Sequence, residues 1–296
     1  MPERDEAPPA SRAGRIALGA ALDVNRLGYG AMRLTGPGVW GEPVDRGEAA
    51  RVLRRALDLG VDFIDTANSY GPEVNERLIR EVLHPYPRGL VIATKGGLVR
   101  PGPGQWVPEG RPAALRAACE SSLARLGVER IDLYQLHSPD RQVPYADSVG
   151  ELARLQAEGK IREIGLSNVN LAQLKEARRL VTVVSVQNRY SVADRSSDDV
   201  LDACERLGIA FIPWFPLEAG AIGRAGGATP AHAALHAVAG AHGCSITRVA
   251  IAWLLARSAV MLPIPGTSSV AHLEENVAAA ALRLGEGEMA TLLSVR

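Results

Sequence analysis

Four residues whose side chains can move protons lie in or just after short apolar runs of this chain. Asp65 and Tyr70 lie in VDFIDTANSYG, Lys95 follows LVIAT, and His137 follows IDLYQL. A tyrosine hydroxyl has an unperturbed pKa of about 10 and is a poor acid or base at neutral pH. We expect a nearby lysine ammonium to lower that pKa by about 1–3 units, a carboxylate to keep the ammonium paired, and a histidine to donate to a carbonyl oxygen. This combination predicts delivery of a proton to an oxygen that gains negative charge.

Each of these residues also has a purely structural interpretation. Asp65 and Tyr70 could cap and pack a turn, and the Asp65–Lys95 pair could be only a structural ion pair. Lys95 could lie on the surface, and a lone histidine such as His137 is more often a satisfied core residue. Lys95, however, lies between LVIAT and two glycines, which places it at the end of a strand. Because four such residues fall at three consecutive strand ends, we interpret them together as a catalytic site.

The elements that would position these residues alternate between strands and helices. The apolar runs are continuous, which is typical of parallel strands covered on both faces. Strands are expected over 27–32, 61–65, 90–94, 131–136, 161–166, 182–186, 209–213 and 260–264. Helices are expected over 45–57, 73–83, 112–126, 147–158, 171–180, 198–207, 231–242 and 247–257, and from about 269. Eight such units predict an α/β fold of the (β/α)8 TIM barrel class, and β-like pieces at 16–18 and 21–24 add a short N-terminal β-hairpin.

A doubly wound open sheet is the alternative architecture. It is disfavoured because no GxGxxG motif follows the first strand. Residues 1–14 contain three prolines and mixed charge without an apolar core, so we expect a flexible tail there rather than a signal peptide. The remaining residues, 15–296, are expected to form one barrel domain.

Composition narrows the classes of function. Thirty-three basic and 33 acidic residues cancel, so neither nucleic acid nor a membrane surface is an expected partner. No apolar stretch approaches the roughly 20 residues of a spanning helix. The three scattered cysteines form no metal-binding or disulfide pattern. We therefore expect a cytoplasmic protein without a metal, monomeric or weakly homo-oligomeric, that acts on a small molecule.

In a barrel of this class, the carboxyl-terminal ends of the strands share one face, which carries the chemistry. Neighbouring strands lie about 4.8 Å apart, so the ends of consecutive strands fall within about 10 Å of each other. The side chains expected on this face are Asp65, Tyr70, Lys95, His137, Ser167, Asn168, Gln187, Trp214, Gly266 and Thr267.

With these residues in place, the chain resembles the aldo-keto reductases, NAD(P)H-dependent reductases built on a (β/α)8 barrel. The resemblance runs from residue 27 to about residue 284 and is carried by FIDTANSYG, ATKG and YQLHS. It implies that Tyr70 is the general acid and that Lys95 and Asp65 tune it. It also implies that His137 orients the carbonyl group of an aldehyde or ketone substrate.

The same resemblance implies a cofactor site. Ser167 and Asn168 in GLSN, with Gln187, would hold the nicotinamide carboxamide, and Trp214 would stack on the nicotinamide ring. The motif IPGTSSVAHLEEN would hold the adenosine phosphate and adenine, where small residues and a helix N-terminus suit a phosphate. The other cofactor contacts implied are Pro216, Leu217, Gly266, Thr267, Ser268, His272, Glu275 and Asn276.

One pair of positions departs from the family pattern. Many NADP-preferring members have Lys and Arg where this chain has Gly266 and His272, and fewer fixed positive charges weaken recognition of a 2′-phosphate. The motifs PGTSSVAHL and GAMRLTGPGVWG nevertheless resemble the pyridoxal reductase branch, which uses NADPH. We therefore expect NADPH as the cofactor, with NADH as the alternative.

Evidence on the substrate comes from two tryptophans on predicted loops. Trp40 and Trp106 could form aromatic walls of a substrate pocket, or they could be ordinary loop packing. The resemblance points to pyridoxal or another aromatic aldehyde, and a general carbonyl or sugar reductase is also compatible with it. A cofactor-binding regulatory or sensor subunit with little turnover is the alternative from another class, since such relatives keep the same four residues.

Overall fold

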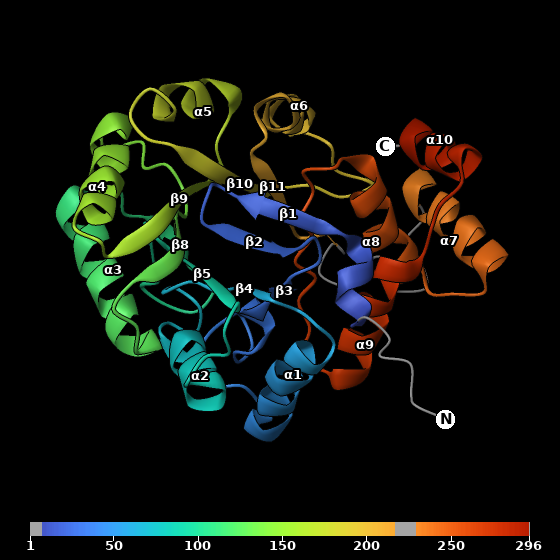
Figure 1. Cartoon of the computed structure of the whole chain (residues 1–296), viewed down its shortest axis with the longest axis horizontal. Coiled ribbons are helices and arrows are strands. Elements are labelled where there is room, and N and C mark those ends of the chain that lie inside the picture. Colours follow the sequence, from blue (N-terminus) through green and yellow to red (C-terminus); the bar gives the residue numbers. More distant parts are fainter. Residues whose placement is uncertain (1–7, 217–228, 296) are drawn as a thin grey trace.

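The computed structural model describes residues 8–216 and 229–295 of the chain. Within these residues, seven parallel strands form one curled sheet in the order β3-β4-β5-β8-β9-β10-β11, and helices surround it (Figure 1). The strands are β3 (Tyr29–Gly30), β4 (Phe63–Asp65), β5 (Val91–Gly96), β8 (Ile131–Leu136), β9 (Ile161–Ser167), β10 (Val183–Arg189) and β11 (Ala210–Trp214). The helices are α1 (Arg46–Asp58), α2 (Val74–Leu83), α3 (Pro112–Leu126), α4 (Tyr145–Ala157), α5 (Leu171–Ala177), α6 (Asp198–Leu207), α7 (Pro230–His242), α8 (Ile246–Arg257), α9 (Val270–Ala278) and α10 (Glu286–Ser294).

The eighth strand expected over 260–264 is not a regular strand. Its backbone still bonds to both neighbours: the amide of Leu262 donates to the carbonyl oxygen of Phe211 over 2.9 Å, and the amide of Gly28 donates to that of Pro263 over 3.0 Å. Pro263 and Pro265 have no N–H to donate, so a continuous ladder cannot form. The segment therefore closes the barrel between β11 and β3 with isolated hydrogen bonds.

A hairpin of β1 (Arg15–Leu18) and β2 (Leu22–Asn25) confirms the expected N-terminal β-hairpin. Leu18 and Val24 pack with side chains from inside the barrel, such as Phe63. In Figure 1 the hairpin lies across the end of the barrel that faces the viewer. This hairpin fills the barrel at the end opposite to the expected active-site face.

The expected flexible tail is wrong for the residues that precede the hairpin. Pro9–Ala13 form a 3₁₀ helix, η1. Ala10 within it is fully buried, and its amide donates to the carbonyl oxygen of Leu59 over 2.9 Å. Small apolar side chains let this short helix pack closely on the barrel. Residues 1–7 lie outside the described part of the chain.

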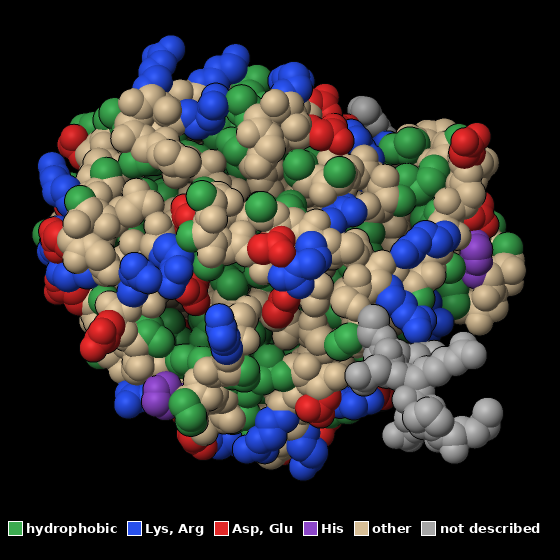
Figure 2. Space-filling view, in the orientation of Figure 1, with side chains coloured by type: hydrophobic (Ala, Val, Ile, Leu, Met, Phe, Trp, Pro, Cys, Tyr) green, Lys and Arg blue, Asp and Glu red, His purple; other side chains and the backbone are tan. Residues whose placement is uncertain are grey.

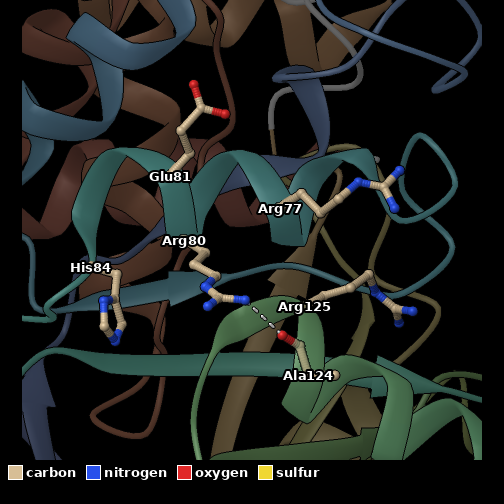
Figure 3. A pocket seen from close by; sticks show the side chains of 6 residues that line it. All are labelled: Arg77, Arg80, Glu81, His84, Ala124 and Arg125. Carbon is tan, nitrogen blue, oxygen red and sulfur yellow. Dashed lines mark hydrogen bonds between the residues drawn. The ribbon is translucent and has the colours of Figure 1, made fainter.

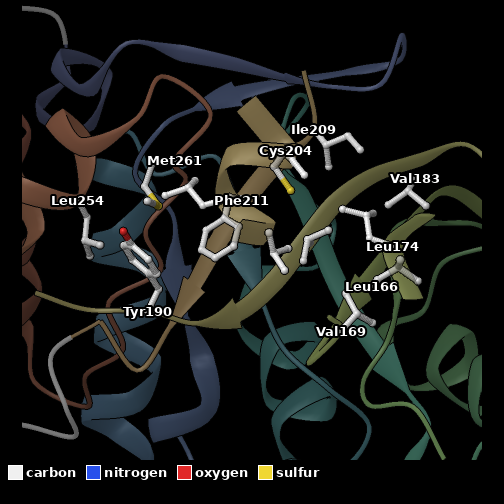
Figure 4. Packing of buried hydrophobic residues seen from close by; sticks show 14 of the residues in the cluster. Leu166, Val169, Leu174, Val183, Tyr190, Cys204, Ile209, Phe211, Leu254 and Met261 are labelled. Atoms are coloured by element: carbon white, nitrogen blue, oxygen red, sulfur yellow. The ribbon is translucent and has the colours of Figure 1, made fainter. Parts of the chain in front are cut away.

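The layer between the sheet and the helices is apolar. Helix α1 buries an apolar stripe formed by Ala49, Val52, Leu53 and Ala56. Figure 4 shows another part of this layer, where Leu166 and Phe211 of the sheet meet Leu174, Cys204 and Leu254 of α5, α6 and α8. Burying a side chain of this size contributes about 1.5–3 kcal/mol to folding, and this layer fixes where the strand ends lie.

The outer surface carries charges of both signs. Figure 2 shows Lys and Arg side chains interspersed with Asp and Glu over the face that it presents. Among the residues that the structure describes, no single helix is long and apolar enough to cross a membrane. Only α7 and α8 taken together, with a bend of 100° between them, have that length and composition.

Candidate active site

The structure brings the four predicted residues together at the carboxyl-terminal ends of the strands. Asp65 ends β4, Lys95 lies in β5, His137 follows β8, and Tyr70 lies in the turn before α2. The Lys95 Nζ atom is 2.5 Å from Asp65 Oδ1 and 3.5 Å from the Tyr70 hydroxyl oxygen. The Tyr70 and His137 rings meet edge to face, with centroids 5.9 Å apart. The ammonium therefore lies between the carboxylate and the phenol.

The register of the sheet explains this arrangement. Asp65 pairs with Ala93 on β5, and Lys95 pairs with Gln135 on β8. Since alternate residues of a strand share a face, Asp65, Lys95 and Gln135 all point into the barrel. Gly165 of β9 leaves room for Gln135, because a Cβ atom there would lie 2.8 Å from its Cγ atom.

Two glutamines complete the surroundings of the carboxylate. Gln135 Nε2 and Gln187 Nε2 donate to Asp65 Oδ2 over 3.1 and 2.8 Å. The other carboxylate oxygen accepts from Lys95, whose Nζ atom also donates to the carbonyl oxygen of Thr66 over 2.8 Å. Both oxygens of the buried carboxylate are thus bonded, as a buried charge requires.

Burial and the ion pair act in opposite directions on the pKa values of this site. Burial raises the pKa of Tyr70 above its usual value, although the Lys95 ammonium acts to lower it. Lys95 thus acts in the expected direction, but burial outweighs it, so the pKa of the phenol is raised rather than lowered. Burial also acts to lower the pKa of Lys95, but the Asp65 carboxylate and then Tyr70 outweigh it and raise that pKa. Tyr70 is a protonated phenol, and Lys95 a charged ammonium, at neutral pH.

His137 is neutral in the same environment. Burial, and then the charge of Lys95, place its pKa well below the usual value. Its Nδ1 atom lies 3.4 Å from the hydroxyl oxygen of Ser69. A neutral imidazole can donate one hydrogen bond to a carbonyl oxygen without adding a charge to the site.

A cavity of about 1020 Å³ opens above these side chains. Lys95 lies beneath it, fully buried. Of the predicted residues, those that line the cavity are Asp65, Tyr70, Trp106, His137, Ser167, Asn168, Gln187, Trp214, Pro216, Gly266, Thr267, Ser268, His272, Glu275 and Asn276. Leu217 lies outside the described residues.

The two predicted pocket tryptophans have different positions. Trp106 lines the cavity, and its ring centroid is 6.3 Å from that of Tyr70 and 6.4 Å from that of His137. Trp40 does not line the cavity, so its assignment to the cavity wall is wrong. Its ring packs on Arg100 instead, 5.6 Å from the guanidinium carbon.

Asn168 connects the catalytic end of the cavity to Trp214. Its Nδ2 atom donates to the backbone carbonyl oxygen of His137 over 2.9 Å and to Ser167 Oγ over 3.1 Å. Its Oδ1 atom accepts from the Trp214 indole over 3.0 Å. Asn168 holds this position with a φ of 57°, in the left-handed region that asparagine tolerates better than most residues. Both amide protons of Asn168 are thus engaged within the protein.

Next to Asp65, with which Gly30 pairs across β3 and β4, two glycines let β3 approach the closing segment. A Cβ atom on Gly266 would lie 2.6 Å from the carbonyl oxygen of Gly30, and one on Gly30 would lie 2.6 Å from that of Ile264. A lysine at position 266 would require the backbone to move. Arg33 lines the cavity. Its Cγ atom lies 3.7 Å from the position that a Cβ atom on Gly266 would occupy.

Glu275 is held in place by two donors. Ser245 Oγ and an Arg248 guanidinium nitrogen each lie 2.6 Å from its carboxylate oxygens. Burial acts to raise the pKa of Glu275, but these donors outweigh it and lower the pKa below its usual value. Ser245 also caps α8, because its side chain accepts from the Arg248 amide. The charged Glu275 is therefore fixed where the N-terminus of α8 meets the cavity.

The motifs, the barrel and the geometry of this site agree with comparison to known proteins. The model of the aldo/keto reductase family matches residues 26–296. The chain belongs to the aldo/keto reductase family. It is 50% identical over 283 residues to an uncharacterized oxidoreductase of Schizosaccharomyces pombe, covering 96% of this chain and 90% of that protein.

Other aldo/keto reductases are similar in sequence or in structure. The pyridoxine 4-dehydrogenase of Escherichia coli is 46% identical over 277 residues, which are 91% of this chain and 94% of that protein. The structure of a glycerol dehydrogenase from Gluconobacter oxydans superposes with a TM-score of 0.85 at 26% identity, over 95% of this chain and 94% of that one. An aldo-keto reductase from Klebsiella pneumoniae in complex with NADPH superposes with a TM-score of 0.80 at 27% identity, over 94% and 93%.

Several residues of this aldo/keto reductase site were not predicted. Gln135 could have been found, because it lies two residues before His137 and hence on the same face of the strand. The sequence marks Arg33 less clearly: it is a charged residue that directly follows a predicted strand containing glycines. The other cavity-lining residues that we did not predict are Gly30, Met32, Val39, Phe215, Ser245, Ile246, Thr247 and Ile264.

A second hollow, of about 500 Å³, lies outside the barrel between α2 and α3 (Figure 3). Arginines line it, but they already have protein partners. Arg80 donates to the carbonyl oxygen of Ala124 over 3.0 Å, and Arg125 donates to buried Glu76 over 2.6 Å. Arg77 is likewise ion-paired. These arginines balance helix ends and carboxylates, so we assign no ligand site to this hollow.

Proposed function

We propose that this barrel, acting as one domain, is an NADPH-dependent reductase of aldehydes, with Tyr70 as the proton donor. The observation that carries the proposal is the position of the Lys95 Nζ atom between Asp65 and the Tyr70 hydroxyl, at the end of a large cavity. A buried ammonium beside a phenol favours the phenolate that remains after proton transfer. The arrangement thus suits reduction of a carbonyl group.

The protein residues divide the work of this reaction. Bound NADPH supplies the hydride. Tyr70 gives its hydroxyl proton to the carbonyl oxygen as negative charge develops there, and Lys95 stabilises the resulting phenolate. His137, neutral at pH 7, donates a hydrogen bond that fixes the direction of the carbonyl oxygen. Asp65 keeps Lys95 charged and in place.

The residues present fit a phosphorylated dinucleotide. Trp214 offers an aromatic face near the catalytic end, held by its hydrogen bond to Asn168. The N-terminal residues of α8, from Ser245 to Thr247, line the cavity, and helix N-termini favour phosphate. Among the described residues that line the cavity, Arg33 is the one with an Arg or Lys side chain. It supplies a positive charge that the glycine at position 266 cannot supply. We infer that NADPH is preferred over NADH.

The relatives and Trp106 support a proposal for the substrate class. The Escherichia coli relative is named a pyridoxine 4-dehydrogenase and covers nearly the whole chain. Trp106 presents an indole beside Tyr70 and His137, and aromatic faces pack well on flat rings. We propose pyridoxal or another aromatic aldehyde as the substrate.

Cofactor binding and turnover test this proposal together. NADPH should quench the fluorescence of the isolated protein, Trp214→Phe should remove most of that quenching, and NADH should bind about tenfold more weakly because it lacks one phosphate contact. Oxidation of NADPH, followed at its absorbance band, should be faster with pyridoxal or 4-nitrobenzaldehyde than with xylose. Tight NADPH binding without oxidation by any aldehyde would instead indicate a regulatory or sensor subunit. A preference for xylose would contradict the substrate class alone.

A further inference from the structure

Arg100 directly follows β6 (Leu98–Val99), a short strand after β5, and its guanidinium group joins three loops. It donates to four backbone carbonyl oxygens, and three of these bonds, to Gln105, Val39 and Gly38, are 2.7 to 3.0 Å long. The fourth, to Ser69, is 3.3 Å long. The residue is only 8% exposed. Within the described part of the chain no ion pair of Arg100 is present, so its hydrogen bonds are to neutral carbonyl groups.

Two of the bonded loops reach the catalytic end of the cavity. Ser69 immediately precedes Tyr70. Val39 lines the cavity, and it is a β-branched residue with a φ of 56°. Such a residue in the left-handed region is strained, so its conformation needs support. The bond from Arg100 to the Val39 carbonyl oxygen provides that support.

The third loop carries Trp106, whose ring lies on the same guanidinium. The guanidinium carbon is 3.7 Å from the centroid of the Trp106 ring, a close cation–π contact. Trp106 is 37% exposed, so little of the protein core holds it. The backbone after Trp106 is held by the pairing of β7 (Val107–Pro108) with β6, and the contact with Arg100 fixes the indole itself next to Tyr70 and His137.

From these contacts we infer that Arg100 is a positioning residue that determines selectivity for flat aromatic aldehydes. It holds Trp106 and Val39 as walls of the substrate end of the cavity, and Trp106 then stacks on the ring of the substrate. The inference rests on the proposed function. Lysine cannot replace this arginine, because an ammonium lacks the planar set of donors that bonds several carbonyl groups while stacking on an indole.

Arg26 offers a matched control. Its guanidinium also donates to backbone carbonyl oxygens, those of Met261, Leu255 and Ser258. Neither Arg26 nor any of these three partners is among the described residues that line the cavity. Arg26→Lys therefore removes the same kind of structural support at a distance from the substrate. Melting temperatures of Arg100→Lys and Arg26→Lys show whether the two changes disturb the fold to a similar extent.

Kinetics with a flat and a flexible aldehyde test the inference. For 4-nitrobenzaldehyde, Arg100→Lys should raise KM about tenfold, the size expected from loss of a strong cation–π contact and of the stack it supports. Its kcat, its KM for butanal and its Kd for NADPH should stay near wild type. Arg26→Lys should leave the KM values for both aldehydes, the kcat and the Kd for NADPH near wild type. Fluorescence quenching by 4-nitrobenzyl alcohol, which needs no turnover, should show the same roughly tenfold loss of affinity in Arg100→Lys.

Trp106→Leu shows whether Arg100 acts through the indole. This change should reproduce the loss for 4-nitrobenzaldehyde, and adding Arg100→Lys to it should have little further effect. Equal KM increases for the two aldehydes, an equal effect of Arg26→Lys, or full additivity of the two changes would overturn the inference. If Arg100→Lys does not fold, unchanged selectivity in Trp106→Leu overturns it as well. Lack of wild-type turnover with both aldehydes would instead contradict the proposed function.

Discussion

The chemistry of the site depends on a positive charge that burial opposes. Lys95 is fully buried, and removing an ammonium from water is costly unless it is paired and hydrogen-bonded. Asp65 pairs with it, and two glutamines bond the other oxygen of that carboxylate. The charge therefore persists beside Tyr70, whose phenol burial keeps protonated. A neutral donor with a cation beside it is what proton transfer to a developing alkoxide requires.

The depressed pKa of His137 predicts a dependence of stability on pH. Unfolded histidine binds a proton below about pH 6.5, whereas folded His137 remains neutral there. Because the unfolded state then binds more protons, the free energy of unfolding should fall as the pH drops from about 6.5 toward the folded pKa, by up to about 1.4 kcal/mol per pH unit. Above this range the contribution is fully present.

Urea unfolding of the wild type and of His137→Asn between pH 7.5 and 5 measures this contribution. All other ionisable groups are common to both proteins, so the difference between the two curves isolates His137. The wild type should lose more stability than the variant over this range. Parallel curves would show that His137 is not held neutral by its surroundings.

At the scale of elements, the cavity depends on close approach of β3 and the segment that closes the barrel. Gly30 and Gly266 each face a backbone carbonyl oxygen at a distance that leaves no room for a side chain. Tyr29 of β3 also donates to the carbonyl oxygen of Thr267 over 2.5 Å. This contact brings Thr267 and the following residues to the cavity edge.

Gly266→Ala should therefore destabilise the protein by about 1–3 kcal/mol, because the new methyl group meets backbone rather than a movable side chain. Gly240→Ala is the matched control: it lies inside α7 with nothing within 4 Å of its would-be Cβ atom. There the same change should stabilise by up to about 1 kcal/mol, since alanine is the better helix former. Urea unfolding measures both. Equal stability of the two variants would contradict the close approach.

The sequence predicts an element well when the residues that determine its ends lie next to it in the chain. The bounds of α3, β8 and α6 match the prediction, and Pro112, Gly127 and Gly208 mark the helix ends in the chain itself. The segment 260–264 was misjudged because its prolines interrupt the ladder although its apolar pattern is that of a strand. The four catalytic residues, Asp65, Tyr70, Lys95 and His137, were predictable because they lie at the ends of consecutive strands. The contacts of Arg100 join segments that are distant in the chain, so no local pattern in the sequence predicts them.

Over the whole molecule, the two ends of the barrel have different roles. The β1–β2 hairpin fills one end with apolar side chains, and Figure 1 shows it lying across that end. The cavity lies at the other end, where it is lined by Asp65, Tyr70, His137, Trp214 and the N-terminal residues of α8. The chemistry thus lies at the end of the barrel opposite the hairpin.

Turnover by Tyr70→Phe tests the central claim most directly. The change removes one hydroxyl group and little volume, so the melting temperature and the Kd for NADPH should stay near wild type. Loss of the proton donor should reduce kcat for pyridoxal or 4-nitrobenzaldehyde by about 10²–10⁴-fold. If the variant binds NADPH normally and keeps more than about a tenth of wild-type turnover, Tyr70 does not donate the proton and the proposed mechanism is wrong.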